Sequence, residues 1–213
     1  MGKLRILLIA IAVFGIAVPQ AEASIVFSFS ESGGNVLMQS SGVLDTSKLV
    51  SISPSGYSGW GDRGIETNSP PESDIMGDTT MGSLDTWFAF NVGTDLSPWI
   101  GNMFTVDHFG WATAGTTQFA TYYRNPNRTP GLGISAADLV GNLWTPDVSW
   151  STPGTFASLG MTVGDYTITD SRTNESISIQ IRSVPEPGTI ALLGLGLAGL
   201  GASRRRRKTQ QAH

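Results

Sequence analysis

Apolar and polar residues alternate in short runs through the middle of the chain. The runs are rich in β-branched and aromatic residues and occupy residues 25–30, 87–92, 104–109, 119–123, 165–169 and 176–181. A period of two with this composition is typical of half-buried antiparallel strands. Clusters of Gly, Pro, Ser and Asn separate the runs, as turns do. We therefore expect an all-β body, an antiparallel β-sandwich or jelly-roll of about 8–10 strands.

Three local details refine this expectation. The last two runs predict a hairpin that pairs residues 166–169 with residues 177–181. Residues 135–140 are expected to form a short helical turn, with Ser135 as its N-cap. Residues 53–85, rich in Gly, Pro and acids, are expected to form a long loop.

The N-terminus has the three parts of a secretory signal peptide. Lys3 and Arg5 precede an apolar run at residues 6–18, and Ala21-Glu22-Ala23 is an A-x-A cleavage site. Residues 1–23 are therefore predicted to be removed between Ala23 and Ser24. The alternative is an uncleaved N-terminal anchor, although the apolar run is short for a membrane span.

The C-terminus also has three parts, followed by a tail at residues 209–213. Residues 184–188 are a Pro-containing break, residues 189–203 are apolar, and residues 204–208 are five consecutive cations. As a helix, residues 189–203 would extend about 22 Å, which is marginal for a hydrocarbon core of roughly 30 Å. The cations are expected to stay in the cytoplasm. A single transmembrane helix would then hold the body, residues 24–183, outside the inner membrane.

This order resembles the PEP-CTERM sorting signal of Gram-negative bacteria. The resemblance rests on Pro185, Glu186 and Pro187, the apolar segment and the cationic block, which is Arg204, Arg205, Arg206, Arg207 and Lys208. It implies processing at the Pro-Glu-Pro segment by an exosortase-type membrane protease, and retention by the cations until then. It also implies an association with exopolysaccharide and biofilm. The alternatives are a permanent single-span anchor and a nucleic-acid-binding patch of arginines, which would need a soluble face.

The two terminal signals together predict a route for the protein. The Sec translocon and signal peptidase would export the chain, and the membrane helix would hold its body transiently in the periplasm. The processed product would then reach the cell surface or the extracellular matrix. The resemblance covers only the last 30 residues or so and implies nothing about the chemistry of the body.

Composition and charge exclude several function classes. The chain has no Cys and only two His, His108 and His213, which excludes thiolate metal sites, disulfides and a multi-histidine metal site. Six bases and fifteen acids give the body a net charge of −9 with histidine neutral. Binding to nucleic acid is therefore disfavoured, because attraction to phosphate dominates such affinity.

The sequence singles out no catalytic or metal-binding group in the body. Asp107 and His108 are neighbours on an expected strand, so they would face opposite sides and form no dyad. No G-x-S-x-G motif occurs. Ca²⁺ could bind carboxylates in the Gly-rich stretch, but the EF-hand spacing is absent, and we expect a solvated loop and no cofactor. The acids in that stretch are Asp62, Glu66, Glu72, Asp74, Asp78 and Asp85.

Six tryptophans are numerous for this length. Trp87 and Trp111 lie in or beside expected strands and are predicted to be core residues. Trp60, in a Gly-rich loop, is the best candidate for stacking on a sugar. We expect a non-catalytic exported protein of the cell surface or matrix. The alternatives are a carbohydrate-binding module for matrix polysaccharide and a secreted hydrolase.

Overall fold

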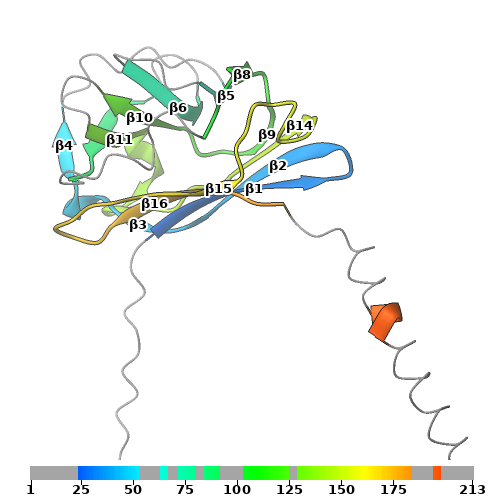
Figure 1. Cartoon of the computed structure of the whole chain (residues 1–213). Coiled ribbons are helices and arrows are strands. Elements are labelled where there is room, and N and C mark those ends of the chain that lie inside the picture. Colours follow the sequence, from blue (N-terminus) through cyan, green and yellow to red (C-terminus); the bar gives the residue numbers. More distant parts are fainter. Residues whose placement is uncertain are drawn as a thin grey trace, which may run out of the picture.

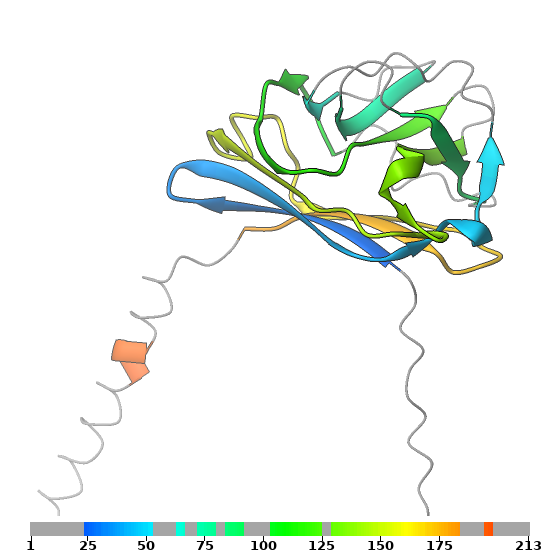
Figure 2. The same cartoon turned by 180° about the vertical axis from the view of Figure 1, so that it is seen from behind.

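The computed structural model is an all-β body of two facing sheets and a small third sheet (Figure 1). The structure describes residues 24–52, 63–66, 72–79, 84–91, 103–124, 129–183 and 194–197. The view from behind shows the same two layers, with the six-stranded sheet below the other (Figure 2). The sequence prediction of an all-β body is confirmed, but the expected number of about 8–10 strands is too low, because the described residues contain sixteen.

The six-stranded sheet has the order β15-β16-β1-β2-β14-β9. Its strands are β1 (Ser24–Ser32), β2 (Asn35–Gly42), β9 (Ala112–Gly115), β14 (Val148–Pro153), β15 (Gly164–Thr169) and β16 (Ser176–Ile181). The predicted last hairpin is confirmed, since β15 and β16 pair antiparallel with Ile168 opposite Ile177. β1 and β2 form a second hairpin over Gly33 and Gly34, whose φ angles of 59° and 79° suit glycine.

One strand pair differs from the predicted antiparallel arrangement. β1 and β16 are parallel, with Ser24 opposite Ser176 and Phe29 opposite Ile181. A parallel pair needs a long connection, and here the whole of the intervening body supplies it. Alternation within each run shows which side is buried but not which strand is the partner, so the sequence did not reveal this pairing.

The second sheet has seven strands in the order β4-β7-β11-β10-β6-β5-β8. They are β4 (Val50–Ile52), β5 (Arg63–Ile65), β6 (Glu72–Asp78), β7 (Thr86–Ala89), β8 (His108–Phe109), β10 (Phe119–Arg124) and β11 (Thr129–Ile134). The prediction of a loop throughout residues 53–85 is wrong, because β5 and β6 pair there. β5 is short and contains Gly64 at φ 143°, where a side chain would overlap the carbonyl oxygen of His108. Such a strand shows no clear alternation.

The run at residues 104–109 was also overestimated as a strand. Only His108–Phe109 pair within a sheet, while Phe104 forms a single bridge with Met161. The short helical turn is confirmed as a 3₁₀ helix, η3 (Ala136–Asp138), in which Ala137 N donates to Ser135 Oγ at 3.3 Å. β3 (Leu44–Asp45), β12 (Leu139–Val140) and β13 (Leu143–Trp144) form the third sheet, and η1 (Thr46–Lys48) follows β3.

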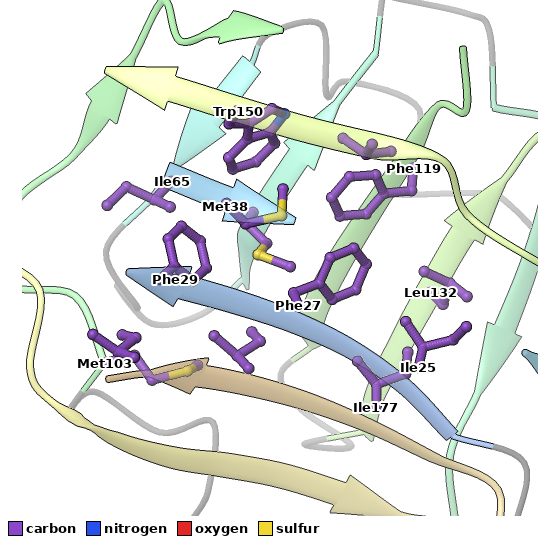
Figure 3. Packing of buried hydrophobic residues seen from close by; sticks show 14 of the residues in the cluster. Ile25, Phe27, Phe29, Met38, Ile65, Met103, Phe119, Leu132, Trp150 and Ile177 are labelled. Atoms are coloured by element: carbon purple, nitrogen blue, oxygen red, sulfur yellow. The ribbon is translucent and has the colours of Figure 1, made fainter. Parts of the chain in front are cut away.

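The core lies between the two large sheets (Figure 3). Phe27 of β1 stacks on Phe119 of β10, with ring centroids 4.7 Å apart and planes 16° apart. Phe119 also stacks on Trp150 of β14 at 6.0 Å. Each such fully buried side chain contributes about 1.5–3 kcal/mol through removal of apolar surface from water. The inward positions of the alternating runs therefore hold the layers together.

The predicted transmembrane helix falls mainly outside the described residues. Residues 194–197 form one helical turn of the segment 189–203. Among the residues that the structure describes, no helix has the length and apolar character to cross a membrane. Residues 1–23 lie outside the described part of the chain.

Candidate functional site

The residues that the sequence assigns to sorting lie mostly outside the described part of the structure. These are Ala23, the motif residues Pro185, Glu186 and Pro187, and the cations Arg204, Arg205, Arg206, Arg207 and Lys208; the sugar-binding candidate Trp60 also lies outside. Ser24 is described and is the first residue of β1, where its Oγ accepts a hydrogen bond from Ser176 Oγ at 3.0 Å. The predicted mature N-terminus therefore coincides with the first residue of a central strand.

The C-terminal boundary of the body is held by Arg182, the residue after β16. Its backbone N donates to the carbonyl oxygen of Phe29 at 3.1 Å. Its guanidinium donates to both carboxylate oxygens of Asp165, at 2.9 and 2.7 Å. These hydrogen bonds and the positive charge of Arg182 lower the pKa of Asp165. Arg182 is thus attached to both β1 and β15.

The described tryptophans belong to the core. Trp87, Trp111, Trp144 and Trp150 are all buried, at most 2% exposed, which confirms the prediction for Trp87 and Trp111. Trp111 packs against Trp150, with ring centroids 5.4 Å apart. Buried rings have no face available to stack on a sugar. A carbohydrate site on this body would therefore use other groups or a tryptophan outside the described residues.

A buried carboxylate joins the two large sheets where β5, β6, β9 and β14 approach one another. Asp78 of β6 accepts hydrogen bonds from Trp150 Nε1 at 2.7 Å and from Thr113 Oγ1, and its Oδ1 lies 2.9 Å from Arg63 Nε. Asp78 is only 7% exposed. Because all these donors hold its oxygens, the carboxylate serves to link strands. The prediction that the acids of residues 53–85 are solvated is therefore wrong for Asp78.

His108 lies beside this cluster, on β8. Its Nε2 is 3.3 Å from Thr152 Oγ1 of β14, and its ring meets Trp111 edge-on with centroids 5.5 Å apart. Trp111 Nε1 donates to the carbonyl oxygen of His108 at 3.3 Å. The half-buried His108 is therefore positioned by packing and by a hydroxyl group from the other sheet.

Two carboxyl groups meet next to His108. The register pairs Ile65 with His108, which brings Glu66 opposite Asp107. Burial raises the pKa of Glu66, and the nearby negative charge of Asp107 raises it further. A raised carboxyl pKa is common in catalytic sites and also in structural clusters. Within the described ranges, no group of three or more His, Asp or Glu could hold a metal ion.

Sequence reasoning missed the buried acids of the body. Glu175 is 1% exposed, accepts from Lys48 Nζ at 2.8 Å and from Asp45 N at 2.9 Å, and so connects the last hairpin to β3. For Asp78 a weak signal exists, since Arg63 is the only base among residues 53–85. No comparable local signal marks Glu175, whose partners lie about 130 residues earlier.

Comparison with known protein families gives one match, at the C-terminus. Residues 183–207 match the PEP-CTERM protein-sorting motif. Comparisons with curated proteins and with solved structures found no match. The chain therefore carries the sorting signal of an exosortase substrate, and the body is assigned to no known family by similarity.

Proposed function

We propose that this chain, which carries a PEP-CTERM sorting motif, is a non-catalytic protein of the cell surface or extracellular matrix. The motif makes it an exported substrate of an exosortase-type system in a Gram-negative bacterium. The observation that carries the sorting part of the proposal is the boundary between body and motif. β16 ends at Ile181, Arg182 is bonded to Phe29 and Asp165, and the motif begins at residue 183. Cleavage within the motif releases every strand of the body.

Chain length supports a transient attachment close to the membrane. Five residues, 184–188, separate the body from the apolar segment. Fully extended, they span at most about 18 Å. The Sec translocon would deliver the chain, and signal peptidase would cut between Ala23 and Ser24. The exosortase would then act at Pro185–Pro187 while the cations at residues 204–208 retain the substrate.

The chemistry of the buried acids favours a structural body over an enzyme. Asp78, Asp170 and Glu175 are buried, and each accepts hydrogen bonds that tie separate parts of the fold together. A secreted hydrolase is the alternative, and it would draw on Glu66 and Asp107. If the purified protein cleaved a polysaccharide and Glu66→Gln abolished that cleavage, the non-catalytic proposal would be wrong.

The sorting proposal is tested by intact mass spectrometry of the protein from an exosortase-containing host. The expected product begins at Ser24 and ends within residues 185–187. Replacing all five cations at residues 204–208 with Gln should release an unprocessed chain, whereas Gln210→Ala with Gln211→Ala, just beyond the cations, should be processed normally. A wild-type product that still carries residues 204–208 would instead establish a permanent membrane anchor.

A further inference from the structure

The outer face of the six-stranded sheet has an unusual side-chain composition. Ile25, Phe27 and Phe29 of β1 point into the core, so the alternate positions of β1 and of its neighbours point outward. Exposed examples from four of the strands are Ser28, Gln39, Ser41, Ala114, Thr167 and Thr169. Hydroxyl, amide and methyl groups therefore cover this face, which we call the hydroxyl face.

The hydroxyl face is nearly free of charge although the body is acidic. Among its outward positions on the six described strands, Asp165 alone is charged, and it is neutralised by the bidentate contact with Arg182 at the edge. The body has fifteen acids against six bases. Its excess negative charge is therefore carried by other surfaces, and a ligand on this face need not displace water from an unpaired ion.

Most side chains of the hydroxyl face are short, and some are hydrogen-bonded across strands. Thr167 Oγ1 donates to Ser178 Oγ at 2.8 Å, and Ser176 Oγ donates to Ser24 Oγ at 3.0 Å. Ser178 is only 5% exposed because its neighbours pack around it. Short side chains lose little conformational entropy on binding. The face is therefore a pre-organised array of donors and acceptors.

The composition argues against most classes of partner. Nucleic acid and anionic lipid need a basic surface, which the hydroxyl face lacks. Stable protein interfaces concentrate aromatic residues and Arg at their centre, whereas Val26 and Leu37, half-buried, are the largest apolar residues there. A second copy would add another body of charge −9 without such anchors. A polyhydroxylated, uncharged chain matches both the neutrality and the hydrogen-bonding groups.

We propose that the hydroxyl face binds an uncharged polysaccharide chain. Neighbouring strands lie about 4.8 Å apart, a spacing close to the length that one pyranose unit adds to an extended chain. A polymer crossing the strands can therefore offer hydroxyl groups to each strand in turn. Single hydrogen bonds to sugar are weak in water, so binding depends on many contacts and grows with polymer length. The relevance of this binding rests on the proposed location outside the cell.

The test uses affinity electrophoresis of the purified protein in gels containing soluble neutral glucan, xylan or dextran, with alginate as the anionic comparison. The sample is the mature protein, or the detergent-solubilised full chain if processing fails, so that binding is measured whatever the fate of the sorting proposal. Gln39→Glu with Gln180→Glu places two charges on the hydroxyl face. Asn142→Asp converts one amide into a carboxylate on an exposed turn elsewhere and is the control for an added surface charge.

We expect retardation in at least one neutral polymer, with dissociation constants raised tenfold or more in the double variant and unchanged in Asn142→Asp. Far-ultraviolet circular dichroism checks that the double variant retains its strands. Three outcomes overturn the proposal: no retardation in any neutral polymer, retardation in alginate alone, or equal binding by the double variant. Sedimentation velocity identifies the competing occupant, since a dimer lost in the double variant would assign the face to a second copy.

Discussion

Two Asp–Arg ion pairs of the body differ in burial and should differ in their contribution to stability. In the Asp78–Arg63 pair the carboxylate side chain is 9% exposed, and in the Asp165–Arg182 pair it is 49% exposed. The contact distances of the two pairs are similar, since the N–O distance is below 3 Å in both. Replacing each Asp with Asn removes the charge and keeps the size. The two variants therefore compare a buried carboxylate, which has two further donors, with an exposed one.

The expected loss for Asp78→Asn follows from its three donors. Trp150 Nε1 and Thr113 Oγ1 converge on Oδ2, and one amide oxygen can still accept from both as a neutral group. Arg63 Nε would then face an amide NH₂, and because Arg63 is half-exposed it can turn into water. Hydrogen bonds to charged groups contribute about 1.5–3 kcal/mol each, and breaking a fully buried pair costs about 3–5 kcal/mol. Because Arg63 is half-exposed, the loss should be smaller than for a fully buried pair. We therefore expect Asp78→Asn to lower the free energy of unfolding by about 2–3 kcal/mol.

Urea unfolding of the processed body, followed by tryptophan fluorescence, measures both variants. With a slope m of about 2 kcal/mol/M, the midpoint for Asp78→Asn should fall by about 1–1.5 M while m stays unchanged. Asp165→Asn should unfold within error of wild type, because exposed ion pairs contribute little. Equal losses in the two variants would refute the argument from burial, as would a loss below about 0.5 kcal/mol for Asp78→Asn.

Three further predictions concern a core phenylalanine, the pH dependence of stability and a closely packed glycine. Phe119→Ala should cost about 3–5 kcal/mol in urea unfolding because Phe119 contacts both sheets, whereas Val140→Ala, at an 82% exposed site, should change the midpoint little. Burial by itself would raise the pKa of Asp170, but hydrogen bonds from Asn91 N and from Arg172 outweigh this effect and lower it. The resulting stabilisation is present above the unfolded-state pKa of about 3.9 and is lost as pH falls through the lowered folded-state pKa. Asp170→Asn should therefore have a lower free energy of unfolding than wild type at neutral pH, and this free energy should fall less steeply on acidification. If the free energies of wild type and variant fell in parallel with pH, the assignment to Asp170 would be wrong. Gly131→Ala should lower the thermal midpoint by several degrees, since the added methyl group would overlap the ring of Tyr122 and the carbonyl oxygen of Phe88; an unchanged midpoint would show that these neighbours can move.

Local sequence patterns predicted an element correctly where a few neighbouring residues determine its structure. The alternation of residues 25–30 and 176–181 predicted strands, and the 3₁₀ helix begins after Ser135 as expected. They failed where a strand is short or interrupted. Arg63–Ile65 contains a glycine at positive φ and a charged residue, and nothing in three residues distinguishes it from a loop.

The sorting signal can therefore be recognised from the sequence alone, whereas the arrangement of the strands in the body cannot. The sorting signal is a linear motif. Its proline break, apolar segment and cations can be recognised without any fold because their order along the chain defines the motif. The sequence by itself also determined the all-β class, the acidic charge of the body and the burial of Trp87 and Trp111. These properties follow from composition and from the period of the side chains along one strand.

Only the tertiary structure decided which distant segments become neighbours. The parallel pairing of β1 with β16, the burial of Asp78 between two sheets, and the hydroxyl face all depend on strand order and register. Ser28 and Gln180 adjoin because β1 and β16 pair, although 151 other residues lie between them in the chain. Strand pairing is set by the total burial of the core, which is a property of the whole body and is not encoded in any single run.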